Sequence, residues 1–282
     1  MKNWSAKQWT RIGGLGILLW VVVYTLEVLI GGPFPVLSLG LLGMGLLALG
    51  VLIYRKLIIQ FQDTRQQVHA STSQVEALWY FFQKVSPRKA LPRMRGYAAS
   101  PDFLNQMIDL VETQQPKLIV ECGAGLSTIV NAYLTEAWPK TQVIGLDHSA
   151  EYAAKTKANL ADHGFTEEKA KVVHAPLKSY QIAGTSWKWY DFPGSEGLEK
   201  GSIDLLIIDG PPVHIQSMAR YPALPLLDEY LSSRARILID DGFRPDDTAM
   251  VHRWLKEFPG WELAQTIPTE KGAYILKRVD RN

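Results

Sequence analysis

The chain has 282 residues, which is long enough for one sizeable domain and an accessory region. With 47% hydrophobic and 21% charged residues, its composition is that of a folded protein and excludes a disordered chain. A net charge of +2 does not favour nucleic acid as a partner, because phosphate binding needs a concentrated basic face. The single cysteine excludes an internal disulfide.

Two apolar runs lie near the N-terminus. Between residues 12 and 30 the only strongly ionising side chain is Glu27, and between residues 36 and 54 there is none. Each run has about the 20 residues that a helix needs to cross a bilayer core. We therefore predict a transmembrane helical hairpin over residues 1–57, with its turn at residues 31–35. A cleaved signal peptide is the competing interpretation, but the first run is long for one and no small-residue cleavage pattern follows it.

Basic residues at the outer ends of the two runs indicate the orientation. Lys2, Lys7 and Arg11 precede the first run, and Arg55 and Lys56 follow the second. Because positive residues favour the cytoplasmic side, we expect a multi-pass protein of the inner (cytoplasmic) membrane with its catalytic domain in the cytoplasm.

Residues 58–92 form the predicted connecting segment. Val68, Val75, Leu78, Trp79 and Phe82 have helix-compatible spacing and predict an amphipathic helix. Its apolar face would pack on the soluble domain or on the same helix of another subunit, so a homo-oligomer held by the hairpin and this helix is possible. Prolines near the end of the segment break the helix, and the soluble domain is expected at residues 93–282.

From residue 117 the chain alternates strand-like and helix-like segments. Strands separated by helices predict an α/β domain with a mostly parallel sheet covered on both faces. In such sheets ligands bind beyond the carboxyl ends of the strands. We place parallel strands at residues 117–121, 142–147, 171–174, 203–209 and 236–240, followed by an antiparallel hairpin at residues 261–267 and 272–277.

Acidic residues end four of these predicted strands. They are Glu121, Asp147, Asp209 and Asp240, and Asp241 follows directly. A single acid after a strand is often only a turn or helix cap. Four acids at one edge of a sheet predict a ligand site instead.

Several motifs resemble those of the class I S-adenosylmethionine-dependent methyltransferases, over about the last two thirds of the chain. A Gly-x-Gly run after an acid, and a second acid at the end of the next strand, are similar to the family's first two motifs. The Asp-Gly-Pro and Asp-Asp strand ends resemble a bacterial subgroup. The resemblance implies a Rossmann-like, seven-stranded, mostly parallel sheet with one reversed strand in a terminal antiparallel hairpin. The motifs read ECGAGLST, VIGLDHS, IDLLIIDGPP and ILIDDGFRPDD.

The same resemblance implies S-adenosyl-L-methionine as the cofactor. Glycines would let the backbone approach its methionine part, and Glu121 would compensate its ammonium or hold a water beside it. Asp147 would accept hydrogen bonds from two ribose hydroxyls, as an acid does in dinucleotide folds. The expected cofactor-binding residues are Glu121, Gly123, Gly125, Ser127, Asp147, His148, Ala175 and Asp209.

Two other functions remain as alternatives. An NAD-dependent oxidoreductase also uses a glycine turn and a distal acid, but Thr128 stands where its third glycine would fall. A non-catalytic member of the fold could bind cofactor or a protein partner. The retained acids at one edge favour an enzyme over both.

Methyl transfer to a hydroxyl needs a base that removes the proton. Asp209 and His214 are the expected catalytic residues, and Asp241 is the next candidate. Asp209, Asp240 and Asp241 could also hold a divalent cation such as Mg²⁺, which prefers oxygen ligands. The alternative is that Asp240 and Asp241 cap the following turn, and we therefore assign no metal ligand.

The methyl acceptor is expected to be a small molecule or a glycan or lipid-linked precursor, because the enzyme is anchored at a membrane. Aromatic residues in the insert at residues 184–200 could stack on such an acceptor or form a small core of their own, and both interpretations stay open. Arg220 could hold an anionic substrate. The aromatic residues are Trp187, Trp189, Tyr190 and Phe192.

Overall fold

Two helices make up the N-terminal part of the chain. In the computed structural model, which describes residues 6–31, 36–192 and 198–279, α1 spans Ala6–Leu29 and α2 spans Val36–Lys84. Most of the turn expected at residues 31–35 lies outside the described residues. The helix α2 does not end near residue 57 but continues to Lys84, for 49 residues in all, because neither glycine nor proline occurs from residue 51 to residue 84.

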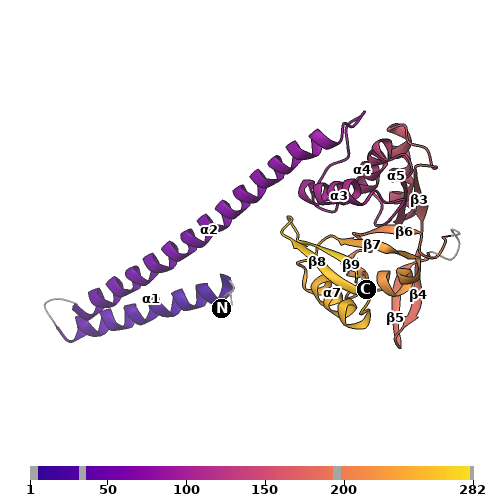
Figure 1. Cartoon of the computed structure of the whole chain (residues 1–282). Coiled ribbons are helices and arrows are strands. Elements are labelled where there is room, and N and C mark those ends of the chain that lie inside the picture. Colours follow the sequence, from indigo (N-terminus) through magenta and orange to yellow (C-terminus); the bar gives the residue numbers. More distant parts are fainter. Residues whose placement is uncertain (1–5, 32–35, 193–197, 280–282) are drawn as a thin grey trace. The chain divides into compact units, whose positions relative to one another are not determined.

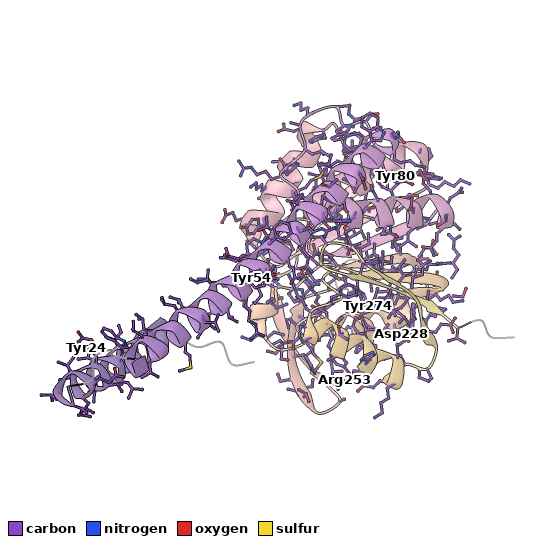
Figure 2. All side chains as sticks on the ribbon, turned by 90° about the vertical axis from the view of Figure 1, so that its left-hand side faces the viewer. Tyr24, Tyr54, Tyr80, Asp228, Arg253 and Tyr274 are labelled. Carbon is purple, nitrogen blue, oxygen red and sulfur yellow. The ribbon has the colours of Figure 1, made fainter. Side chains whose placement is uncertain are left out.

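One helix in the described part of the chain is long and apolar enough to cross a bilayer. It is the segment Leu39–Lys84 of α2, and none of its most apolar window is buried. The described apolar part of α1, Gly16–Leu29, is shorter than such a span. The expectation of two spanning helices is thus supported for one of them. Tyr24 of α1 and Tyr54 of α2 are both exposed (Figure 2).

The C-terminal end of α2 belongs to the second of two compact units, Met1–His69 and Ala70–Asn282. There it packs on α3, which spans Pro101–Gln114. Phe81 is fully buried, the hydroxyl of Tyr80 donates to Asp109 (2.5 Å), and the amide of Asn105 donates to the carbonyl of Ala77 (2.9 Å). The folded domain therefore begins about twenty residues before the expected residue 93.

A seven-stranded sheet forms the centre of the second unit, in the order β3-β2-β1-β6-β7-β9-β8 (Figure 1). The neighbours from β3 to β7 pair in parallel, and β9 runs antiparallel to both β7 and β8. This confirms the predicted Rossmann-like sheet with one reversed strand. The strands are β1 (Leu118–Cys122), β2 (Gln142–Asp147), β3 (Ala170–His174), β6 (Ile203–Ile208), β7 (Leu231–Ile239), β8 (Trp261–Ile267) and β9 (Ala273–Arg278).

Each face of the sheet packs on its own hydrophobic core. Successive strand residues point to opposite faces, so in β1 Ile119 enters one core and Val120 the other. The first core contains α3, α4 (Leu126–Ala137) and α5 (Ala150–Asp162). The second contains α6 (Ala223–Leu227), α7 (Pro245–Glu257) and the strand β5 (Thr185–Tyr190).

The aromatic insert folds as an antiparallel hairpin, β4 (Leu177–Ile182) and β5 (Thr185–Tyr190). Its aromatic rings are buried rather than open to a ligand, and Trp187 lies 4.6 Å from the ring of Tyr221, centroid to centroid. The structure therefore contradicts the stacking surface, and it places these rings in the second core of the sheet rather than in a small core of their own. Residues 193–197 of the insert lie outside the described residues. The buried rings are those of Trp187, Trp189, Tyr190 and Phe192.

Candidate functional site

The four acidic strand ends lie side by side at one edge of the sheet. Strands β2, β1, β6 and β7 are consecutive neighbours, and each carries one of the acids within one residue of its carboxyl end. Parallel strands bring their carboxyl ends to the same edge, which is where ligands bind in this architecture. The predicted gathering of acids is therefore present. They are Glu121, Asp147, Asp209 and Asp240.

The turn after β1 is tied to both neighbouring strands. The amides of Gly123 and Ala124 donate to the carbonyl of Leu146 (2.9 and 2.8 Å), and the amide of Asp209 donates to the carbonyl of Cys122 (2.9 Å). Gly123 has a φ of 107°, and a Cβ atom there would lie 3.1 Å from the carbonyl group of Asp209. Both the conformation and the close approach require glycine at position 123.

Neither the backbone conformation nor the packing requires glycine at position 125. Its φ of 179° is extended backbone that any residue adopts, and an added Cβ would meet no atom within 4 Å. The missing side chain leaves open space at the N-terminal end of α4, where backbone N–H groups have no partner within the helix. This is the kind of space that a bound cofactor would fill.

Glu121 is fully buried beneath this turn. The hydroxyl of Ser127 donates to one of its carboxylate oxygens, and Thr128 Oγ1 donates to the other at 2.8 Å. Burial raises the pKa of Glu121 to about 7, although the hydrogen bonds from Ser127 and Thr128 offset part of this shift. Thr128 Oγ1 also accepts from the amide of Gly125 (3.0 Å). Ser127 and Glu121 thus use their polar atoms to hold the turn together.

Asp147 lies at the end of β2 and is almost fully buried. Its Oδ1 accepts from the amide of Ser149 (2.8 Å) and lies 3.6 Å from Nδ1 of His148. Burial raises the pKa of Asp147. The amide of the buried Ala175 donates to the carbonyl of Asp147 (2.8 Å), so the structure brings these three predicted site residues together. The Oδ2 atom of Asp147 accepts no hydrogen bond from a described residue.

The hydroxyl end of Tyr190 reaches this edge as well. A Cβ atom on Gly210 would lie 2.3 Å from the hydroxyl oxygen of Tyr190, so only glycine fits beside it. The Tyr190 ring lies 6.4 Å from that of His148. From the sequence, Tyr190 is expected only as part of an aromatic insert. Its position beside His148 and Gly210 could not be predicted, because it depends on how the hairpin folds onto the sheet.

Asp209 and Asp241 are joined by one arginine. Arg220, which is 3% exposed, places Nη2 3.1 Å from Asp209 Oδ1 and 2.7 Å from Asp241 Oδ2. Its Nη1 donates to the carbonyl of Asp240 (2.8 Å). Because this guanidinium is buried and paired, Arg220 is not open to an anionic substrate, and that expectation was wrong. Burial and the charge of Asp240 raise the pKa of Asp209 well above its usual range.

Asp240 lies deepest in the cluster. It is fully buried, and among the described residues none donates a hydrogen bond to its carboxylate; the Nζ of Lys271 lies 3.9 Å from Oδ2. Burial, followed by the charge of Asp241, raises the pKa of Asp240 to about 6. Lys271 also lies 3.4 Å from Asp241 Oδ1 and donates to the carbonyl of Gly96 (2.9 Å). No sequence signal marked Lys271, which stands in the turn before β9.

The three carboxylates expected to hold a metal do converge. Asp209, Asp240 and Asp241 each offer an oxygen atom within 4.8 Å of the other two. Arg220 contacts two of the three, and Asp241 Oδ2 also accepts from Arg244 Nη1 at 2.6 Å. Both oxygens of Asp240 and Oδ1 of Asp241 accept no hydrogen bond from a described residue, but a divalent cation bound there would lie beside the buried guanidinium of Arg220, so the cluster does not fit it well.

His214 does not join the cluster. It lies in the short 3₁₀ turn Val213–Ile215, is exposed, and makes no hydrogen bond or ion pair with another described residue. No hydrogen bond or ion pair between described residues joins the two expected catalytic residues, Asp209 and His214. Two exposed apolar side chains, those of Val213 and Phe243, lie in the segments that follow β6 and β7 at this edge of the sheet.

Comparison with known families finds one match. Residues 120–242 match a family described as a methyltransferase domain. This range begins in β1 and ends just after β7, so it contains all four acidic strand ends. No curated protein matches the chain.

Solved structures share the fold. The SAH-bound methyltransferase PaMTH1 of Podospora anserina matches with a TM-score of 0.51 and 17% identity, over 78% of this chain and 96% of that one. An O-methyltransferase from Bacillus cereus in complex with SAH has a TM-score of 0.47 and 16% identity, over 66% of this chain and 84% of that one. At such identities the likeness to PaMTH1 shows the fold alone.

Proposed function

We propose that this chain, which carries a class I S-adenosylmethionine-dependent methyltransferase domain, methylates a hydroxyl oxygen of a small molecule or of a glycan or lipid-linked precursor. The observation that carries the proposal is the open space at Gly125 between the buried Glu121 and the strand end at Asp147. A glycine that nothing else in the fold requires, next to two acids, fits a cationic nucleoside cofactor.

The cofactor would be held by the ends of β1 and β2. The free amides at the start of α4 and the space beside Gly125 suit its methionine part. Asp147 keeps Oδ2 available for ribose hydroxyls, and His148 and Ala175 adjoin the same strand end. When bound, S-adenosylmethionine supplies a methyl group activated by the positive sulfonium. The chain's task is then to align the acceptor and to remove its proton.

Asp209 is the better supported of the two candidate bases. Arg220 holds its Oδ1, while Oδ2 accepts no hydrogen bond from a described residue. Burial raises the pKa of Asp209, which makes it a stronger base than an exposed carboxylate. His214 is exposed and held by no described side chain, so it has no fixed orientation toward an acceptor.

The apolar segment of α2 supports a membrane anchor. The basic residues at the outer ends of the two apolar runs are our reason to place the domain on the cytoplasmic side of the inner membrane. An anchored enzyme meets membrane-bound acceptors, and the exposed Val213 and Phe243 offer apolar contact beside the acidic edge. These features favour a lipid-linked or otherwise partly apolar acceptor.

Self-association through α2 is a further part of the proposal, with a second copy of this chain as the partner. Phe61, Val68, Val75 and Phe82 are exposed and recur every seven residues, which is the repeat of a two-stranded coiled coil. Trp79 lies beside them and is 74% exposed. Residues of this helix that pack on the folded domain, such as the buried Phe81, are interspersed with these positions, and the ring of Phe81 lies 5.1 Å from that of Phe82.

Titration calorimetry on the purified full chain tests the enzyme proposal. We expect S-adenosylmethionine to bind, and Asp147→Ala to weaken this binding strongly, while NADH does not bind. Tritiated methyl transfer from the cofactor to a membrane extract then identifies the acceptor class. Binding without any transfer would support the non-catalytic alternative, and binding of NADH alone would overturn the proposal in favour of an oxidoreductase.

A further inference from the structure

Arg220 lies at the centre of the acidic cluster after β6 and β7. Its guanidinium bonds to the carboxylates of Asp209 and Asp241 and to the main-chain carbonyls of Asp209 and Asp240. It lies 3.8 Å from the carboxylate of the buried Asp247 as well. One side chain from the segment before α6 therefore ties together the ends of two neighbouring strands.

The charges around Arg220 are nearly balanced without any added ion. Four buried or mostly buried carboxylates meet three cations, two of which reach in from the rim of the cluster. Burial alone lowers the pKa of an arginine, but the carboxylates outweigh it and raise the pKa of Arg220, so it stays charged. The carboxylates belong to Asp209, Asp240, Asp241 and Asp247, and the cations to Arg220, Arg244 and Lys271.

A divalent cation would have to bind through the oxygens that the two arginines leave open, such as those of Asp240. Asp241 Oδ2 receives both Arg220 (2.7 Å) and Arg244 (2.6 Å), and Asp209 Oδ1 receives Arg220. A cation on the remaining oxygens would lie within a few ångströms of a buried guanidinium, where Coulomb repulsion is strong.

We propose that Arg220 takes the place of a divalent cation at the ends of β6 and β7, so that this site binds no metal and methyl transfer is metal-independent. Arg220 is also a positioning residue. Its hydrogen bond to Asp209 Oδ1 fixes the orientation of the carboxylate, and therefore also the direction of Oδ2. This second statement rests on the proposed function, whereas the absence of a metal site does not.

Binding of Mn²⁺ to the full chain, followed by the electron paramagnetic resonance signal of the free ion, tests the first statement without any cofactor or acceptor. We expect the wild-type chain to deplete no free Mn²⁺. Arg220→Met should gain one site, because the carboxylates lose their central cation, and the double variant with Asp240→Asn should lose it again. Arg253→Met is the matched control, since that arginine pairs with Glu257 in α7 (2.8 Å) and should gain no site.

The outcomes separate clearly. A stoichiometric Mn²⁺ site in the wild-type chain that Asp240→Asn abolishes would overturn the proposal, as would a folded Arg220→Met variant that gains no site. If Arg220→Met does not fold, the wild-type titration decides alone.

For the positioning role, Arg220→Lys should lower kcat at least tenfold and shift its pH profile while the affinity for S-adenosylmethionine is unchanged. An unchanged pH profile would overturn that role but leave the metal result standing.

Discussion

Thr128 Oγ1 and Glu121 Oε2 are joined by a buried hydrogen bond of 2.8 Å that links the start of α4 to the end of β1. Because Thr128 Oγ1 also accepts from the amide of Gly125, this one hydroxyl fixes both sides of the glycine turn. Threonine at this position is therefore part of the site and not merely a missing glycine.

Replacing Thr128 with valine keeps the shape of the side chain but removes its hydroxyl. Two buried groups, the Glu121 carboxylate and the Gly125 amide, would lose a partner, and we expect the free energy of unfolding to fall by about 1–3 kcal/mol. Urea denaturation measures this change. Thr113→Val is the control: its hydroxyl bonds an exposed helical carbonyl, and its effect should stay within about 0.5 kcal/mol. Equal effects of the two substitutions would contradict the role of Thr128.

The protonation of Glu121 should make stability depend on pH. Its pKa rises from 4.5 to about 7 on folding, so the folded chain holds this proton more tightly than the unfolded chain. The resulting stabilisation is complete below the unfolded pKa and is lost as the pH rises through about 7, at up to about 3 kcal/mol.

Denaturation of the wild-type chain and of Glu121→Gln across this pH range measures that contribution. The glutamine variant should show a smaller fall in the free energy of unfolding between pH 5 and about 7. Glu136→Gln, at a half-exposed position, should keep the wild-type slope. A slope that is the same in all three proteins would exclude Glu121 as its source.

The two glycines of the turn should respond in opposite ways to alanine. Gly125→Ala points a methyl group into open space, so the free energy of unfolding should change by less than about 0.5 kcal/mol. The affinity for S-adenosylmethionine should nevertheless fall by about tenfold, a loss of about 1.4 kcal/mol. Gly123→Ala forces alanine into a φ of 107°, and we expect about 1–3 kcal/mol of destabilisation.

Thermal denaturation and calorimetry on both variants test this contrast. If Gly125→Ala binds the cofactor as tightly as the wild-type chain, the space beside Gly125 does not hold the cofactor.

The apolar segment of α2 should anchor the chain. A lysine near the middle of a spanning helix costs about 2.5–3.5 kcal/mol, so the double substitution Leu46→Lys and Leu47→Lys should release the protein from membranes. Carbonate extraction followed by sedimentation measures the membrane-bound fraction. Leu263→Lys, at an exposed position of β8, is the control and should stay bound. Retention of the double variant would show that this segment does not anchor the chain.

The exposed stripe on α2 should mediate self-association. Truncating Val75 of this repeat and the neighbouring Trp79, with Val75→Ala and Trp79→Ala, should convert dimers to monomers, because truncating buried interface side chains commonly costs about 1–4 kcal/mol each. Light scattering of the purified chain in detergent gives the oligomeric state. Glu76→Ala, on the same helix turn but outside the stripe, should leave the dimer intact. A wild-type chain that is monomeric throughout would end this part of the proposal.

The sequence predicted the sheet and the edge of the site well, because both depend on local pattern. Apolar runs of strand length separated by helical segments indicate parallel strands, and parallel strands place their carboxyl ends together. Glu121, Asp147, Asp209 and Asp240 therefore could be assigned to one edge before any coordinates. The end of the second apolar run near residue 57 is not the end of a helix, since charged residues such as Arg55 and Lys56 continue a helix without strain.

Only the tertiary structure decided what the acids do at that edge. Arg220 is 21 residues before Asp241 in the sequence, and the two side chains are hydrogen-bonded. Lys271, in the turn before β9, pairs with Asp241 although α7 lies between them in the sequence. No local pattern encodes such pairings, because they depend on which side chains the folded sheet and its loops bring within a few ångströms. The sequence by itself determined a methyltransferase-like sheet with acids at its ligand edge. The fold decided that a buried arginine, rather than an open triad of carboxylates, lies at its centre.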